Sequence, residues 1–187
     1  MKKLFLALIC AAVGLSASPP AFADASDPVL IGTYSGWKAY HFQDKAGQVC
    51  FMSRQPEKQQ GNFKKRGEVF FFVTHWSGEK DKNVVSVSNG YGFKQKSLAT
   101  LSFKGKKFNL FTQGEMAWTK DQAEDVAVIK ELQSGSSMSI KGTSSRGTET
   151  ADTYNLKGSA EAYKAIIKQC AAEKAPHPVP ASDKEKN

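Results

Sequence analysis

The segment 153–170, TYNLKGSAEAYKAIIKQC, changes from a strand pattern to a helix pattern and ends on a cysteine. Its first residues are the β-favouring types threonine and tyrosine, and Gly158 is placed to end the strand. Ser159 is a residue type that favours the N-cap of a helix. The side chains that recur at i, i+3, i+4 and i+7 share one helix face; they are Tyr163, Ile166, Ile167 and Cys170. The segment predicts a closing helix that packs on a β-sheet and directs the Cys170 sulfur inward.

The N-terminus has the features of a secretory signal peptide. A basic pair, Lys2-Lys3, precedes an apolar run over residues 4–15, which is shorter than the roughly 20 residues of a membrane-spanning helix. Ala21-Phe22-Ala23 supplies the small-x-small pattern of a cleavage site. We therefore expect residues 1–23 to be a signal peptide cleaved after Ala23, although an uncleaved anchor is the alternative. The mature protein is then expected in the periplasm, at the outer membrane or outside the cell, with no transmembrane span.

Two cysteines remain after the leader, because Cys10 lies within it. In an oxidising compartment Cys50 and Cys170 are expected to form a disulfide, while two unpaired structural thiols are the alternative reading. The bond would close a loop of about 120 residues, for which chain entropy gives an upper value of ~5 kcal/mol of stabilisation. The chain contains no C-x-x-C spacing, so catalytic thiol chemistry is not indicated.

The chain of 187 residues carries a formal net charge of +8, which falls to +6 without the two leader lysines. Lys64-Lys65-Arg66 and residues 104–107 are the densest basic clusters. A basic surface serves solubility, or it attracts an anionic polymer such as lipopolysaccharide or a host-cell surface component. Export makes nucleic acid an unexpected partner. We expect a short linker at 24–28, one β-rich domain at 29–172 and a disordered, proline- and charge-rich tail at 173–187.

The strand patterns predict a mainly β fold. Segment 68–76 is a continuous apolar run that indicates a central strand covered on both faces, and segment 83–88 alternates like a half-buried strand. Segment 55–67 is predicted to be a long exposed loop. Further strands are expected at 34–42, 49–52, 97–103, 107–111, 138–141 and 148–156. The fold class expected is an antiparallel β-sandwich or a partly open barrel with two short helices, the C-terminal one packed on the sheet and disulfide-linked.

The first of the two helices begins where the strand patterns stop. Asp121 is placed as its N-cap, Glu124 completes a capping box, and Gly135 ends it. Helical spacing predicts that Val126, Ile129 and Leu132 share the inward face.

The sequence contains no recognisable catalytic or metal-binding motif. His41, His75 and His177 occur without an H-E-x-x-H spacing or a carboxylate cluster, so we expect no metal site, and His75 is expected to be structural. There is no G-x-S-x-G context, and segment 90–94 lacks the Gly-Lys-Ser/Thr ending of a phosphate loop. The sequence therefore predicts no enzyme and no cofactor.

Four aromatic residues near turns are candidates for gripping a sugar or a partner; they are Trp37, Tyr91, Phe93 and Trp118. The first hypothesis is a non-enzymatic exported domain that binds an envelope or host-surface component. The alternative is a carbohydrate- or polyanion-binding module that uses Trp118, Tyr91 and nearby lysines.

Several segments of the chain resemble the invasion-associated locus B family of exported alphaproteobacterial proteins. The segments are GWKAYHFQDKAGQVCFMSRQP, GYGFK, FTQGEMAWTKDQAED, MSIKGTSSRGTETADTYNLKG and the helix that ends in Cys170. The resemblance covers about residues 31–170 and implies a β-rich periplasmic or outer-membrane-associated protein, in a family named for a role in host-cell entry. No enzymatic chemistry is established for the family, so there are no catalytic residues to carry over. The matching positions are Trp37, Cys50, Gly142, Gly147, Gly158 and Cys170.

The chain departs from the family pattern at two positions. Some members have a cysteine near the position of His41, and its absence here leaves Cys170 as the partner of Cys50. Members tend to have a hydrophobic residue after the glycine of the Leu-Lys-Gly motif, where this chain has Ser159, which implies a different start of the last helix.

Overall fold

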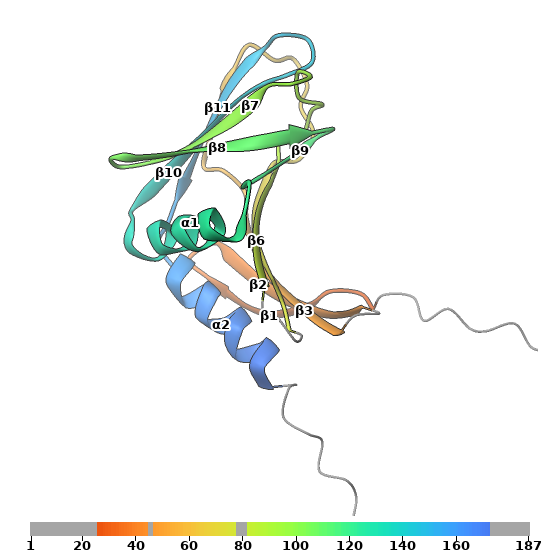
Figure 1. The fold of residues 1–187 in the computed structure, drawn as a ribbon, viewed down its shortest axis with the longest axis vertical. Helices are drawn as coiled ribbons and strands as arrows, with labels where there is room; N and C mark the ends of the chain where they lie inside the picture. The colour runs from red at the N-terminus through yellow and green to blue at the C-terminus, as the bar shows by residue number, and fades with distance from the viewer. Residues whose placement is uncertain (1–25, 45–46, 78–81, 173–187) are drawn as a thin grey trace, which may run out of the picture.

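The fold is a single open antiparallel sheet with two helices, as shown by a computed structural model that describes residues 26–44, 47–77 and 82–172 (Figure 1). Its strands are β1 (Val29–Tyr34), β2 (Trp37–Asp44), β3 (Gly47–Arg54), β4 (Lys58–Gly61), β5 (Phe70–Trp76), β6 (Lys82–Ser88), β7 (Leu98–Phe103), β8 (Lys106–Gln113), β9 (Met116–Trp118), β10 (Ser137–Thr143) and β11 (Glu149–Asn155). The helices are α1 (Gln122–Ser134) and α2 (Ser159–Ala172). The strand order is β1-β2-β3-β5-β6-β9-β8-β7-β10-β11-β4. The predicted mainly β class with two helices is confirmed.

The sheet bends so strongly that its two halves face each other across one core. Trp37 of β2 meets Phe71 of β5 at a ring-centroid distance of 6.0 Å, and Phe71 meets Tyr154 of β11 at 6.2 Å. The Trp37 indole N–H also donates a hydrogen bond of 3.3 Å to the Asn155 carbonyl. Because β2 and β11 lie far apart in the strand order, these contacts close the bent sheet over its interior.

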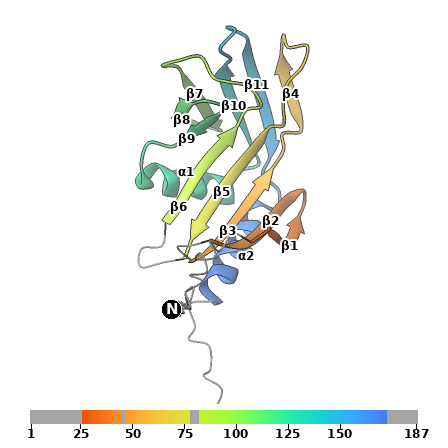
Figure 2. The same cartoon turned by 90° about the vertical axis from the view of Figure 1, so that its right-hand side faces the viewer.

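Both helices lie on the inner face of the first half of the sheet (Figures 1 and 2). The helix α2 packs on β1, β2, β3 and β5, and α1 packs on β6 and on α2. No helix within the described ranges is long and apolar enough to cross a membrane.

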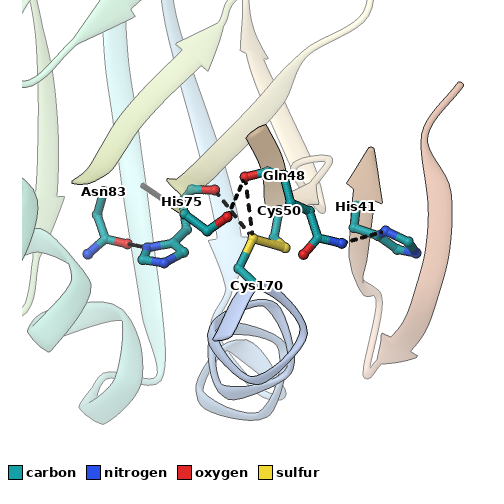
Figure 3. Close-up of a disulfide and its surroundings, with 7 residues drawn as sticks. His41, Gln48, Cys50, His75, Asn83 and Cys170 are labelled. Carbon is teal, nitrogen blue, oxygen red and sulfur yellow. Dashed lines mark hydrogen bonds between the residues drawn. A yellow bond between two sulfur atoms is a disulfide. The ribbon is translucent and has the colours of Figure 1, made fainter. Parts of the chain in front are cut away.

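The predicted disulfide is present and fastens α2 to β3. Cys50 and Cys170 are fully buried, their Cα atoms are 6.0 Å apart, and 120 residues separate them in the chain. Figure 3 shows the bond beside two histidines of neighbouring strands. His75 is 6% exposed and its Nδ1 lies 3.1 Å from Asn83 Oδ1, while His41 Nδ1 lies 3.1 Å from Gln48 Nε2. The arrangement of His75 agrees with the structural role predicted for it.

The helix α1 begins and ends as the sequence predicts, but its buried face differs. Asp121 accepts a hydrogen bond of 2.9 Å from the Glu124 backbone N–H, and Gly135 follows the last turn. The buried side chains are Asp125, Val128, Ile129 and Leu132, whereas Val126 is 56% exposed. The prediction for Val126 was wrong because the inward stripe follows i, i+3, i+4 and i+7 from Asp125, a polar residue that pattern reading does not place in a core.

Three further expectations are corrected. Segment 55–67 contains the edge strand β4, which pairs with β11 through its backbone while all four of its residues stay exposed. The strand β5 is covered on one face only, because Phe71, Val73 and His75 are buried while the alternate residues are partly exposed. Ser159 is the first residue of α2 rather than the residue that caps it. Its buried hydroxyl lies 2.7 Å from the Leu156 carbonyl and 2.6 Å from the Leu132 carbonyl of α1, so it bonds carbonyl oxygens.

Candidate functional site

Two of the four aromatic residues predicted to bind a ligand are part of the interior. Trp37 is fully buried and Phe93 is 6% exposed. The ring of Phe93 packs on Tyr91 at a centroid distance of 5.3 Å and lies against Gly142, where an added Cβ would meet Phe93 Cε1 at 2.7 Å. Neither side chain is available to a ligand, because the turns that carry them fold inward onto the core.

The other two candidates, Tyr91 and Trp118, lie in separate hollows. Trp118 stacks on Phe111 of the neighbouring strand with a centroid distance of 5.4 Å, in a shallow hollow of about 460 Å³ that also holds Lys82 and Lys120. Tyr91 lines a different and larger cleft. The single site expected to combine Trp118 with Tyr91 is therefore not formed.

The larger cleft has a volume of about 730 Å³ and lies at the upper end of the molecule in Figure 1, where three chain segments meet beside Glu115 of the turn between β8 and β9. The segments are residues 62–67 before β5, residues 90–92 after β6, and the region 144–150 around the turn between β10 and β11. Its cationic lining residues are Lys64, Lys65, Arg66 and Arg146, and Glu115 is the carboxylate in the lining. The cleft therefore carries an excess of positive charge.

A buried ion pair organises this cleft. The guanidinium of Arg66 donates two hydrogen bonds of 2.7 Å to the carboxylate oxygens of Asp152. The two side chains are 3% and 0% exposed. Arg66 also donates to the Asn89 carbonyl at 2.8 Å and lies 5.0 Å from the centroid of the Tyr91 ring. Arg66 is thus committed to internal partners, and it holds the segment 62–67 against β11.

Tyr91 is fixed by hydrogen bonds at its phenol oxygen. The Asn89 amide donates to this oxygen at 2.6 Å, and the Thr150 hydroxyl lies 2.7 Å from it. Burial raises the pKa of the Tyr91 phenol, against the lowering effects of the Thr150 hydrogen bond and the Arg66 charge. The phenol therefore stays protonated at neutral pH, and its ring forms a rigid part of the cleft.

Three cations remain for a ligand. Among the described residues, Lys64, Lys65 and Arg146 form no ion pair, in contrast to Arg66. Hydroxyl groups of the turn, including that of Ser145, lie beside them in the lining. Cations without an ion pair, a fixed aromatic ring and hydroxyls suit a ligand that carries several negative charges.

Sequence reasoning located parts of this cleft but did not assemble it. Tyr91 was a candidate, and Lys64-Lys65-Arg66 was recognised as a basic cluster. The contribution of Arg146 and the pairing of Arg66 with Asp152 were missed, because both depend on the bend that brings residues 62–67 to β11. In residues 26–44, 47–77 and 82–172 no group of three potential metal ligands is found.

Comparison with known proteins agrees with this fold. The family model described as invasion associated locus B protein matches residues 37–167. The crystal structure of invasion associated protein b from Bartonella henselae is similar, with a TM-score of 0.56 and 18% sequence identity over 80% of this chain and 99% of that chain. No curated protein matches the chain by sequence. Since the family model covers more than half of the residues, the chain belongs to the invasion-associated locus B family.

Proposed function

We propose that the protein is an exported, non-enzymatic component of the cell envelope that binds an anionic polymer in the cleft of Lys64, Lys65 and Arg146. The observation that carries the proposal is the difference between the arginine and its neighbours: Arg66 is neutralised by Asp152, whereas these three cations face the cleft without an ion pair among the described residues. The cleft thus neutralises its buried arginine within the protein and presents three further cations to the solvent. Such a site is suited to bind an anion from outside the protein.

The nature of the expected ligand follows from the shape of the site. The cleft is open and large for a single small anion, and its cations come from two segments far apart in the sequence. Such an arrangement favours a chain with repeated negative groups, for example a phosphorylated or carboxylated polysaccharide, whose affinity falls as salt screens the charges. Membership of a family named for invasion supports a role at the envelope or the host surface.

The binding test compares two triple variants with equal charge changes. The cleft variant is Lys64→Gln/Lys65→Gln/Arg146→Gln, and the matched control is Lys104→Gln/Lys107→Gln/Lys157→Gln. The probes are dextran sulfate, neutral dextran and purified lipopolysaccharide, titrated at several salt concentrations. We expect the cleft variant to bind the anionic probes about tenfold more weakly, a change of about 1.4 kcal/mol, while the control stays near the wild type. An equal loss in both variants would show that only net charge matters and would remove the cleft from the proposal.

The proposal that the protein is exported is tested by a separate measurement. Mass spectrometry of the protein purified from the periplasmic fraction is expected to find an N-terminus at Asp24, directly after the proposed cleavage site. Recovery of the intact N-terminus in the cytoplasmic fraction would contradict this part of the proposal without affecting the cleft.

A further inference from the structure

The outward side of the strands β2, β3 and β5 carries aromatic side chains where polar residues are expected. The inward side of these strands is buried and includes Trp37, Cys50 and Phe71. The alternate positions point the other way, since successive side chains of a strand lie on opposite faces. They hold six aromatic residues, Tyr40, Phe42, Phe51, Phe70, Phe72 and Trp76, which we call the outer aromatic face.

The strand register shows that these rings share one continuous surface. Tyr40 pairs across the strands with Phe51, and their rings stack at a centroid distance of 5.0 Å. Phe51 continues to Phe72 at 6.3 Å, and Phe72 to Phe70 at 5.7 Å. Along the row of Phe72, the register runs through Ser86 to Trp118, and Trp118 stacks on Phe111. The aromatic rings on this side of the sheet therefore form two groups, one on β2, β3 and β5 and one on β9 and β8, with Ser86 of β6 between them.

No described element covers this face. Both helices lie behind the strands in Figure 2, where β3, β5 and β6 face the viewer. All six aromatic side chains are partly exposed, and at the margins of the same surface Leu30 is 52%, Phe111 43% and Leu98 55% exposed. An antiparallel sheet with one solvated face normally alternates apolar inward and polar outward residues. A contiguous apolar surface of this kind marks an interaction site.

The chemistry of the face excludes a carbohydrate as its natural partner. Four of its six rings are phenylalanines, which offer no hydrogen bond, whereas a sugar site places polar groups beside its ring stack to bind hydroxyls. Tyrosine and tryptophan with surrounding phenylalanines are typical of surfaces that lie at the boundary between water and lipid.

The charges around the outer aromatic face favour an anionic membrane over a second copy of the chain as its partner. Two lysines border the face at opposite ends of β2 and β6: Lys38 pairs in register with Ser53, and Lys82 with Trp76. Both are exposed, and neither forms an ion pair with another described residue. Asp44 is the carboxylate on this side of β2. Two faces of a protein with a net charge of +6 after loss of the leader lysines would repel each other, whereas lysines beside aromatic rings complement anionic headgroups.

We propose that the outer aromatic face docks on an anionic phospholipid bilayer, with the rings at the headgroup boundary and Lys38 and Lys82 on the phosphates. The bound protein would lie flat on the membrane through β2, β3, β5 and β6 and would keep both helices away from it. This role is separate from the cleft, since it uses other residues on another surface.

The first test measures binding of the full mature protein to vesicles of phosphatidylglycerol and phosphatidylethanolamine, with phosphatidylcholine vesicles as the uncharged comparison. We expect binding to the anionic vesicles, and about tenfold weaker partitioning for Phe51→Thr/Phe72→Thr. Threonine keeps the β-branched preference for strands, and thermal unfolding checks that the variant folds. The matched control is Val126→Thr, which removes an exposed apolar side chain from α1 and is expected to leave binding unchanged.

A second variant tests the proposal independently, in case Phe51→Thr/Phe72→Thr does not fold. Lys38→Gln/Lys82→Gln leaves the rings intact and is expected to lose the preference for anionic vesicles, whereas Lys164→Gln/Lys168→Gln on α2 keeps it. Brominated acyl chains should quench the fluorescence of Trp76, and also that of Trp118 on the same side of the sheet, while the fluorescence of the buried Trp37 stays unchanged. Trp76→Phe should therefore reduce the quenching. Absence of binding by the wild type overturns the proposal, and so does binding of both variants to anionic vesicles as tightly as the wild type. The wild type could also sediment as a dimer that Phe51→Thr/Phe72→Thr dissociates. This result would assign the face to a second copy of the chain and would overturn the membrane proposal as well.

Discussion

Arg66 and Asp152 form a two-point ion pair that is almost completely withdrawn from solvent, although 86 residues separate them in the chain. The pair joins the segment before β5 to the strand β11, and it lies beneath the proposed anion cleft. A buried charge without its partner is strongly destabilising, because the lost solvation is no longer compensated.

The first prediction concerns this pair. Asp152→Asn leaves the Arg66 guanidinium buried without a counter-charge and should lower the free energy of unfolding by about 3–5 kcal/mol. Arg66→Met/Asp152→Leu removes both charges and should recover most of that loss. Urea unfolding measures the free energies, and Lys106→Met, which breaks the half-exposed pair with Glu131, serves as a control with an expected loss below about 1 kcal/mol. A small loss for Asp152→Asn would mean that water reaches the pair.

The second prediction concerns the disulfide. Cys50→Ala/Cys170→Ala should lower the free energy of unfolding by up to ~5 kcal/mol, since the bond restricts a loop of 120 residues in the unfolded chain. Melting temperatures with and without a reducing agent check this for the wild type. The double variant should show the same melting temperature in both conditions. Because both cysteines are fully buried, the native wild type should resist reduction until it unfolds.

The third prediction compares two glycines with similar backbone angles. Gly158 has φ 87° and Gly105 has φ 83°, both in the region that favours glycine. An added Cβ at Gly158 would meet the Tyr34 carbonyl oxygen at 2.2 Å, whereas Gly105 has no atom within 4 Å. Gly105→Ala should therefore cost only the backbone strain, about 1–2 kcal/mol, and Gly158→Ala clearly more. Chemical denaturation of both variants measures the difference, and equal losses would contradict the close approach.

The fourth prediction concerns pH. Burial raises the pKa of the Asp125 carboxyl, although hydrogen bonds from the Thr119 hydroxyl and the Val85 backbone N–H favour its ionised form. The folded protein therefore holds this proton more tightly than the unfolded chain. The contribution of Asp125 to stability is complete below its unfolded pKa of about 4 and is lost as pH rises through the higher folded pKa.

Asp125→Asn removes this titration while an amide oxygen still accepts from Val85. The wild type should thus lose stability relative to Asp125→Asn as pH rises from about 4 towards neutrality. Urea unfolding of both proteins across this range gives the comparison. A difference that does not depend on pH would show that Asp125 has the same proton affinity in the folded and unfolded protein.

The main elements of the fold follow from local sequence patterns. The strands β7 and β8 are predicted from the segments 97–103 and 107–111, and α1 from its cap at Asp121 and its stop at Gly135. The disulfide follows from the presence of two cysteines after the leader. In each case the deciding interaction is local or has a single possible partner.

The missed features depend on distant partners. The strand β4 has no apolar alternation and exists because β11 offers its edge. Trp37 was assigned to a ligand site because it lies near a turn, yet it packs on Phe71 of the core, which in turn packs on Tyr154, through strands that the sequence does not order. The run Phe70–Phe72 was interpreted as buried on both faces of the sheet. In the sequence, apolar residues on the outer face of a strand look the same as apolar residues that face the core.

The position of α2 at the end of the described domain has a consequence for the order of assembly. This helix closes the inner surface of β1, β2, β3 and β5, and it carries the second sulfur of the disulfide. A chain threaded through a membrane with its N-terminus first delivers those strands long before residues 159–172 arrive. For the export that we propose, oxidation and final compaction would therefore wait until nearly the whole polypeptide has crossed, and maturation would be one late step on the far side.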